Sequence, residues 1–213
     1  MLITNRHNLS GRSCETGQPL SPTGGIPNEV VILHNQKAKL GHWLPITESL
    51  LRVNGSPLWH EHPRLKDKAD FVALPLTKLK DIELFSYSMS DTGPDILVAP
   101  SDSVSVVGFP FGLTGGGGLA IWATGFLATE LDVDQFGLPI ALVDCRARPG
   151  QSGSAVIAHR NGGMVTMMNG DTSAFTGQVT KFIGIYSGRV NSESDLGIVW
   201  KSSAIKELLD AMG

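Results

Sequence analysis

The sequence predicts an all-β protein of barrel or sandwich type, followed by one α-helix at its C-terminus. Three observations lead to this prediction. The 213 residues include 25 Gly and 12 Pro, a composition that favours short strands joined by many turns. The second half contains strand-like segments at nearly regular spacing. Only the last dozen residues place their apolar side chains at helical spacing.

The first half consists of short apolar segments separated by turn signals. These segments are LIT (2–4), EVVILH (29–34), HWLPI (42–46), LLRV (50–53), LWH (58–60) and DFVALPL (70–76). The β-branched content of residues 29–34 is typical of a strand, and residues 70–76 alternate before they end at a proline. A polar segment with Gly and Pro, residues 86–100, then predicts a linker between two halves.

The second half contains six strand-like segments and a terminal helix. The segments are SVSVVGFPFG (103–112), LAIWATGFLAT (119–129), LPIALVDC (138–145), SAVIAH (154–159), FIGIYSG (182–188) and LGIVW (196–200). In SSAIKELLDAM (202–212), Ser202 or Ser203 caps a helix whose apolar residues follow a 3.6-residue period. We therefore expect a β domain at 101–200 and a helix at 201–213.

Charge and cysteine content exclude several classes of protein. The net charge of −3 gives no global attraction to nucleic acid or to an anionic membrane. Two cysteines do not form a disulfide framework, and the sequence has neither a signal-peptide pattern nor an apolar run of membrane-spanning length. A cytoplasmic protein is expected. Strand-like residues directly after Met1 indicate a chain that lacks upstream strands.

The segment GQSGS, residues 150–154, places Ser152 in a turn ahead of an apolar run. A serine hydroxyl becomes a nucleophile only when a base takes its proton and a third group orients that base. The chain order of α/β-hydrolases, with the serine before the acid and the histidine, does not fit. The segment lacks the last glycine of G-x-S-x-G, and His159 follows with no acid in between.

The order His, Asp, Ser fits the sequence much better. His7 directly follows the first strand-like segment, and Asp70 begins another. Asp67 and Asp81 compete with Asp70. Asp67, however, lies in the charged run RLKDKAD, which is typical of a solvated face, and Asp81 lies beyond the strand.

Five stretches, taken together, resemble the chymotrypsin-like (trypsin-fold) serine peptidases, and in particular the bacterial branch that includes the high-temperature-requirement proteases. They are LITNRHN, KADFVALPL, VVGFPFG, DCRARPGQSGSAVI and FIGIYSGR, in the expected order. The resemblance implies two six-stranded-type antiparallel β-barrels, the first at residues 1–85 and without its N-terminal strands. It also implies a serine endopeptidase with His7 as the general base, Asp70 as its orienting partner and Ser152 as the nucleophile.

The resemblance also implies how a peptide or protein substrate is held. The backbone N–H groups of Gly150 and Ser152 would form the oxyanion hole. The strand with Tyr186, Ser187 and Gly188 would pair with the substrate backbone and line the primary pocket. Cationic side chains in the two segments that flank this pocket, if they point inward, favour an acidic residue at the cleaved position; they are Arg146, Arg148 and Arg189.

Departures from the family pattern keep a second hypothesis open. Gln151 stands where digestive-type enzymes have an aspartate that binds a newly cut N-terminus, so no proteolytic activation is expected. Ser154 and Ala155 replace the usual glycine and proline. If the missing strands leave His7 loosely held, the chain is an inactive peptide-binding module on the same fold.

Two further motifs suggest other kinds of site. WHEHP (59–63) offers His60 and His62 as metal ligands, which keeps a metal-dependent hydrolase as a third class, although no second Cys or His group completes four ligands. TGGGG (114–118) is glycine-rich like a phosphate loop, but it lacks the Lys-Ser/Thr pair and the helix that such loops need. We therefore expect no metal ion and interpret both segments as loops.

Overall fold

The computed structural model describes residues 1–87, 89 and 94–213. The chain divides into two compact units. Unit 1 comprises Met1–Ser86, Thr114–Leu119 and Glu207–Gly213, and unit 2 comprises Tyr87–Leu113 and Ala120–Lys206. Part of the predicted linker, residues 88 and 90–93, lies outside the described residues. The predicted domain limits themselves stay a prediction.

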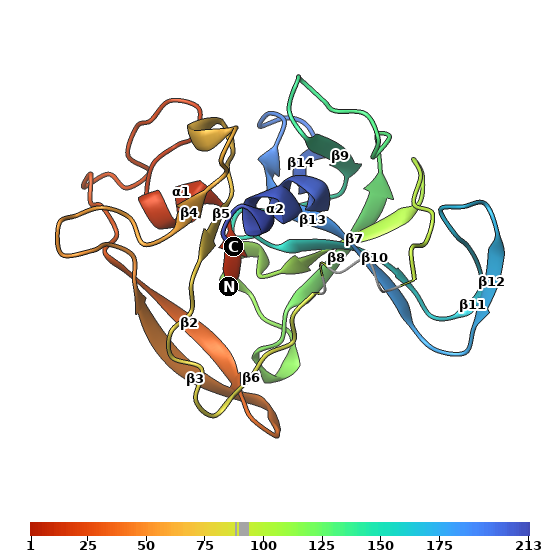
Figure 1. Cartoon of the computed structure of the whole chain (residues 1–213), viewed down its shortest axis with the longest axis horizontal. Coiled ribbons are helices and arrows are strands. Elements are labelled where there is room, and N and C mark those ends of the chain that lie inside the picture. The colour runs from red at the N-terminus through yellow and green to blue at the C-terminus, as the bar shows by residue number, and fades with distance from the viewer. Residues whose placement is uncertain (88, 90–93) are drawn as a thin grey trace. The chain divides into compact units, whose positions relative to one another are not determined.

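Unit 2 is built on a closed antiparallel barrel (Figure 1). Its six strands, in barrel order, are β10 (Ala155–Arg160), β13 (Val179–Arg189), β14 (Leu196–Lys201), β9 (Ile140–Asp144), β8 (Ile121–Leu127) and β7 (Ser103–Gly108). Each of them falls on one of the six strand-like segments. Unit 2 also contains the hairpin β11 (Gly163–Thr166) and β12 (Thr172–Phe175) and the short 3₁₀ helix η2 (Pro110–Gly112), which the sequence analysis does not predict.

The barrel encloses one large apolar core. Its buried members are mostly aliphatic and come from all six strands, together with the loops that close the barrel. Val106, Val143, Val156 and Val199 are completely buried. Strand β13 lies very close to its neighbour β14 at Gly184, where a Cβ atom would collide with the carbonyl of Trp200. Dense aliphatic packing, together with a glycine where two strands approach closely, therefore fits a closed sheet in this part of the chain.

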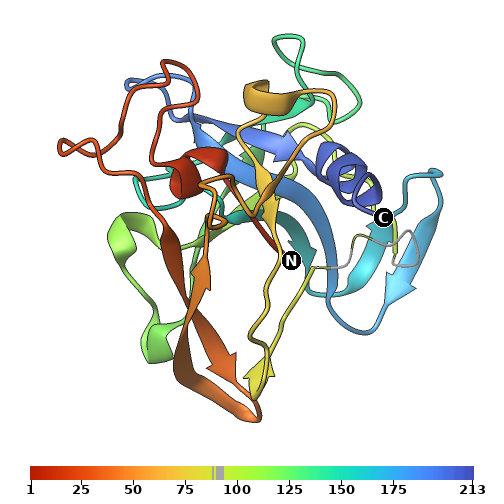
Figure 2. The ribbon, with the colours of Figure 1, turned by 60° about the vertical axis from the view of Figure 1, so that its left-hand side comes forward.

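Unit 1 contains two smaller antiparallel sheets in place of a closed barrel. One has the order β1 (Leu2–Thr4), β5 (Val72–Leu74) and β4 (His60–Glu61). The other has the order β3 (Lys39–Ser49), β2 (Glu29–Gln36) and β6 (Ile82–Glu83), and its β2–β3 ribbon is drawn in orange in Figure 2. Unit 1 also contains α1 (Arg6–Ser10) and the 3₁₀ helices η1 (Lys66–Lys68) and η3 (Gly116–Gly118). One cluster of buried side chains in this unit consists of Leu9, Leu50, Val72 and Leu74, and Phe71 is also completely buried.

The C-terminal helix α2 spans Ser202–Asp210, within the predicted 201–213. Ile205 and Leu208 are buried, as the helical spacing of the apolar residues indicates. The mostly-β architecture, the closed six-stranded barrel and the C-terminal helix confirm the predicted fold class. Among the described residues, no helix has both the length and the apolar character needed to cross a membrane.

Candidate functional site

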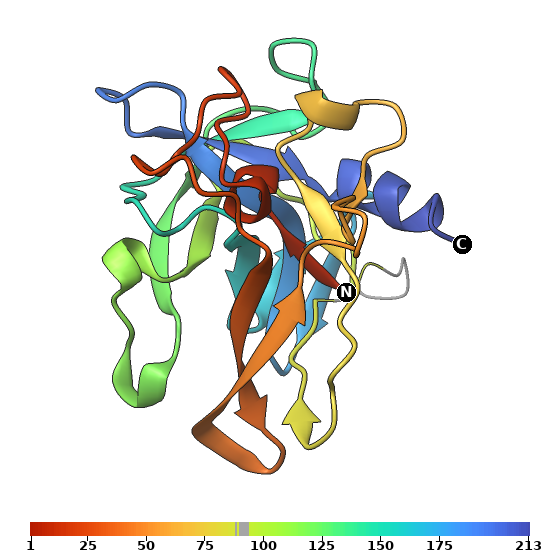
Figure 3. The same cartoon turned by 90° about the vertical axis from the view of Figure 1, so that its left-hand side faces the viewer.

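His7 lies in the short helix α1 and is held by Asp70. Its Nδ1 atom is 2.7 Å from Asp70 Oδ2, and its backbone N–H donates to Asp70 Oδ1 at 3.1 Å. Two contacts to one carboxylate fix both the backbone and the ring of the histidine. Figure 3 shows α1, in red, beside β5, the yellow strand that Asp70 precedes.

Asp70 is itself fixed by side chains that the sequence analysis does not single out. Asn5 is completely buried, and its Nδ2 donates to the backbone carbonyl of Asp70 at 2.6 Å. The Cys14 thiol donates to Asp70 Oδ1 at 2.8 Å. Asp70 is 8% exposed, so a buried carboxylate receives several donors at once. No spacing in the sequence indicates these contacts, because Asn5 and Cys14 meet Asp70 only through the folding of distant segments.

The Cys14 thiol is kept protonated by its surroundings. Burial and the neighbouring Asp70 carboxylate raise the pKa of Cys14 to about 12, while Arg6 acts in the opposite direction. The guanidinium of Arg6 is paired with Glu61 at 2.9 Å. At neutral pH, Cys14 is therefore a hydrogen-bond donor to Asp70 and not a free thiolate.

This arrangement can perform general-base chemistry. A carboxylate beside Nδ1 favours the tautomer with the proton on that nitrogen, which leaves Nε2 as the basic atom. The alternative acids are placed differently: Asp67 is exposed in η1, and Asp81 is exposed in a turn with φ +62°. Of the three candidate carboxylates, Asp70 is the one that contacts a histidine in the described part of the chain.

Ser152, in unit 2, lies in a tight turn between the Gly150 region and β10. Its Oγ donates to the carbonyl of Ser187 at 3.1 Å. The backbone N–H of Gly153 donates to the carbonyl of Tyr186 at 2.8 Å, and the N–H of Tyr186 donates to the carbonyl of Ser154 at 2.9 Å, so the turn is attached to β13 at Ser152 and directly after it. Ser152 is half-buried, which leaves part of it accessible to solvent.

Gly150 occupies a position that other residues do not tolerate. Its φ of +92° lies in the left-handed region, and a Cβ atom would stand 2.7 Å from the carbonyl oxygen of Phe109. The next residue, Gln151, is completely buried, and its Oε1 accepts the backbone N–H of Arg148 at 2.7 Å. The turn is thus stabilised from inside by a neutral side chain, without any ion pair at this position.

The predicted substrate-binding residues have different surroundings. The Tyr186 side chain belongs to the barrel core, and burial raises its pKa to about 12. Its backbone is already paired within unit 2, because its N–H donates to the carbonyl of Ser154 and its carbonyl accepts from the N–H of Gly153. Ser187 lies at an irregularity of the β13–β14 pairing, just before Gly188. Arg146 and Arg189 are exposed, while Arg148 lies 3.8 Å from Asp195.

His60 and His62 are not placed as a pair of metal ligands. His60 is exposed on β4. His62 is buried, its Nδ1 accepts the backbone N–H groups of Arg64 and Leu65, and its Nε2 lies 3.5 Å from Glu207. Burial lowers the pKa of His62, although Glu207 partly opposes that shift. In this unit, His62 connects the segment after β4 to the end of α2.

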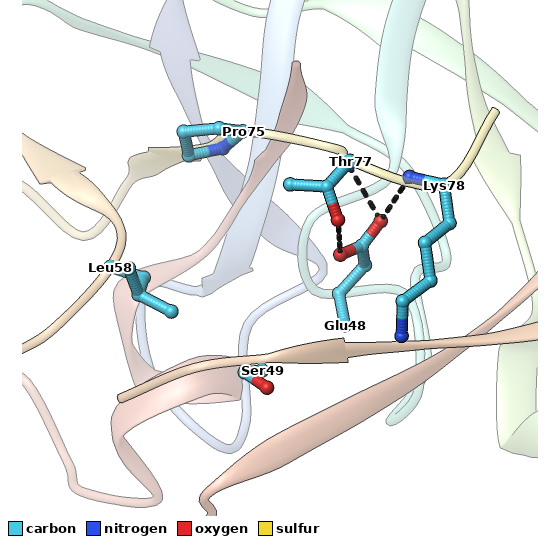
Figure 4. A pocket seen from close by; sticks show the side chains of 6 residues that line it. All are labelled: Glu48, Ser49, Leu58, Pro75, Thr77 and Lys78. Atoms are coloured by element: carbon cyan, nitrogen blue, oxygen red, sulfur yellow. Dashed lines mark hydrogen bonds between the residues drawn. The ribbon is translucent and has the colours of Figure 1, made fainter. Parts of the chain in front are cut away.

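A small pocket in unit 1 does not present catalytic groups. It has a volume of about 140 Å³, and its lining is shown in Figure 4. Its one carboxylate, Glu48, already accepts hydrogen bonds from Thr77 and from the backbone of Lys78. Because these donors occupy both of its oxygens, Glu48 fixes the position of the segment after β5 and has a structural role.

The closed barrel, the two small sheets and the C-terminal helix are consistent with a trypsin-like fold. Similar solved structures are serine proteases. No protein-family model and no curated protein sequence matches the chain.

Three of these structures illustrate the likeness. The Rv3671c protease in its inactive form is 16% identical over 67% of this chain and 60% of its own, with a TM-score of 0.34. The serine endoprotease from Yersinia pestis is 15% identical over 85% of this chain and 53% of its own, with a TM-score of 0.43. The active form of Rv3671c from M. tuberculosis is 14% identical over 100% and 91%, with a TM-score of 0.38. The chain therefore spans 60% and 53% of the first two proteins.

Proposed function

We propose that this chain is a serine endopeptidase in which Ser152, His7 and Asp70 form the catalytic triad. The observation that carries the proposal is the double contact of Asp70 with His7, through the ring Nδ1 at 2.7 Å and the backbone N–H at 3.1 Å. A buried carboxylate fixed in this way orients the imidazole and stabilises its protonated form during the reaction.

The reaction proceeds by acyl transfer. Ser152 Oγ attacks the peptide carbonyl while His7 Nε2 takes the hydroxyl proton, and the backbone N–H groups of Gly150 and Ser152 bind the oxyanion. His7 then gives the proton to the leaving amine, and the acyl-enzyme forms. A water molecule, deprotonated by His7, releases the peptide acid and restores Ser152. Of the predicted strand residues, Ser187 and Gly188 would pair with the substrate backbone, since the Tyr186 backbone is already bonded to Gly153 and Ser154, and no cofactor takes part.

One contact favours the second candidate, an inactive peptide-binding module on the same fold. Ser152 Oγ donates its proton to the carbonyl of Ser187, and this bond must break before a base can take that proton. In such a module, Ser187 and Gly188, at the irregular end of β13, would still pair with a peptide strand, but no covalent step would follow.

Labelling with a fluorophosphonate probe distinguishes the two functions. The proposal predicts that the wild-type chain is labelled and that Ser152→Ala and His7→Ala are not. Ser154→Ala, two residues away in the same turn, is the matched control and should stay labelled. A folded wild-type chain that takes up no probe would contradict the peptidase and favour the binding module.

A further inference from the structure

A third side chain converges on the His7–Asp70 pair and gives it the donor set of a metal site. Cys14 comes from the loop after α1, and Asp70 comes from the segment before β5. One ligand atom from each of His7, Cys14 and Asp70 lies within 4.8 Å of the others. Among the described residues, this is the one group of three or more such side chains that meets this distance.

The chemistry of the three donors selects the kind of ion. A thiolate sulfur, an imidazole nitrogen and a carboxylate oxygen form a mixed set that suits Zn²⁺, whereas Mg²⁺ and Ca²⁺ prefer oxygen ligands. A tetrahedral zinc ion takes three protein ligands and leaves its fourth position to water. It binds sulfur at roughly 2.3 Å and nitrogen or oxygen at roughly 2.0–2.2 Å, so three atoms this close together need only small side-chain movements.

The surroundings also suit a small cation. Asp70 is buried, whereas His7 and Cys14 are partly exposed, so an ion from solvent has access to the donors. The positive charge of Arg6 is offset by its ion pair with Glu61. When the ion arrives, it replaces the thiol proton that Cys14 donates to Asp70, because a coordinating thiol loses its proton to solvent.

We propose that His7, Cys14 and Asp70 bind a zinc ion and that zinc at this site switches the peptidase off. The inhibitory part rests on the proposed function. The ion would take Nδ1 of His7 and one oxygen of Asp70, the two atoms whose contact orients the general base. With Nδ1 bound to the metal, His7 no longer has a carboxylate partner that stabilises its protonated form. The ion is therefore an inhibitor and not a cofactor.

The Cys14→Ser variant separates zinc binding from the support of Asp70. A serine hydroxyl donates to Asp70 as the thiol does, but it is a poor zinc ligand. Cys145→Ser is the matched control, because the Cys145 thiol is buried and donates to the carbonyl of Ala123. Circular dichroism of each variant establishes that it is folded before binding is measured.

Titration of the full chain with Zn²⁺, and with Co²⁺ as a spectroscopic probe, tests the site without any need for activity. We expect one bound ion and a thiolate-to-cobalt charge-transfer band in the wild type and in Cys145→Ser. In Cys14→Ser the band should be absent. The zinc affinity of Cys14→Ser should fall by more than about 100-fold. Loss of a residue that only hydrogen-bonds to a metal ligand typically lowers the affinity by roughly 10- to 100-fold, so a larger loss indicates that Cys14 binds the ion directly. Equal zinc affinity of the wild type and Cys14→Ser, or no binding, would overturn the site.

The inhibitory part is tested by probe labelling with and without zinc. Zinc should stop labelling of the wild type and of Cys145→Ser, and a chelator should restore it, whereas Cys14→Ser should be labelled in both conditions. Labelling that continues in the zinc-saturated wild type would overturn the inhibition. If the metal-free wild type is not labelled while the cobalt band is present, the peptidase proposal and the inhibition fail and the zinc site stands.

Discussion

The two compact units hold their parts of the proposed site in different ways. In unit 2, Ser152 lies in a turn bound to strand β13 of a closed barrel, above a large aliphatic core. In unit 1, His7 lies in α1 and Asp70 lies just before β5, and the polar side chains of Asn5 and Cys14 donate to the backbone carbonyl and to the carboxylate of Asp70. The turn of Ser152 is thus held by a packed barrel, whereas the His7–Asp70 pair is held by individual hydrogen bonds. This difference can be measured by comparing a substitution at each of these places with a control substitution at a more exposed or less constrained position.

The largest effect is expected in the barrel core. Leu127 on β8 is 1% exposed, and Leu127→Ala removes a side chain whose space the surrounding barrel does not refill. The free energy of unfolding should fall by about 2–5 kcal/mol, measured by urea denaturation followed by circular dichroism. Leu196→Ala on β14, where the leucine is 36% exposed, is the control and should change it much less. Equal losses would contradict the view that packing holds the barrel.

The next largest effect concerns the anchor of Asp70. Asn5→Ala removes the hydrogen bond that the buried Asn5 Nδ2 donates to the backbone carbonyl of Asp70. The expected loss of unfolding free energy is about 1–3 kcal/mol, and labelling by the probe should slow as well. Asn54→Ala, at an exposed turn, is the control. An unchanged labelling rate in Asn5→Ala would show that the position of Asp70 does not depend on this bond.

A smaller loss is expected at the turn before Ser152. Gly150→Ala forces an alanine into a left-handed conformation and brings its Cβ close to the Phe109 carbonyl, so stability should fall by about 1–2 kcal/mol. Gly177→Ala is the matched control, because a Cβ there meets no described atom within 4 Å. If both variants melt at the same temperature, the turn is more adaptable than its geometry indicates.

The smallest effect depends on pH and concerns Glu48 in unit 1. Burial alone would raise its pKa, but hydrogen bonds from Thr77 and Lys78 outweigh burial and lower it. A lowered pKa in the folded state stabilises the fold above the ordinary carboxyl pKa of about 4.3, and this contribution disappears as pH falls through the folded value.

Glu48→Gln should therefore be less stable than the wild type near pH 7, and the difference should shrink below about pH 4. Thermal melts across this pH range measure it. Exposed Glu29→Gln is the control and should follow the wild type throughout. A Glu48→Gln difference that stays constant down to acid pH would show that the carboxylate charge is not what stabilises this segment.

The sequence predicts the barrel well because each of its strands has its own apolar pattern. Residues 140–144 and 182–186 need no distant partner to be identified as strands. The hairpin at 163–175 and the five-residue helix α1 are too short for periodicity to indicate them. Unit 1 is also less predictable because its strands β4 and β6 have two residues each.

The site divides in the same way. The choice of His7, Asp70 and Ser152 rests on their order along the chain and on the resemblance to the trypsin-fold peptidases. Their catalytic roles stay a prediction. Asn5 and Cys14 contact Asp70 across 65 and 56 residues of sequence. Such contacts depend on the tertiary fold, and no local pattern of charge or spacing indicates them.

The most direct test of the central claim is the labelling rate of Asp70→Asn. This substitution keeps the size of the side chain but removes the charge that orients His7, which then adopts the wrong tautomer. If Asp70 serves the base that activates Ser152, fluorophosphonate labelling of the metal-free chain should slow by roughly 10⁴-fold while the circular dichroism spectrum stays unchanged. A folded Asp70→Asn chain that is labelled at the wild-type rate would contradict the triad.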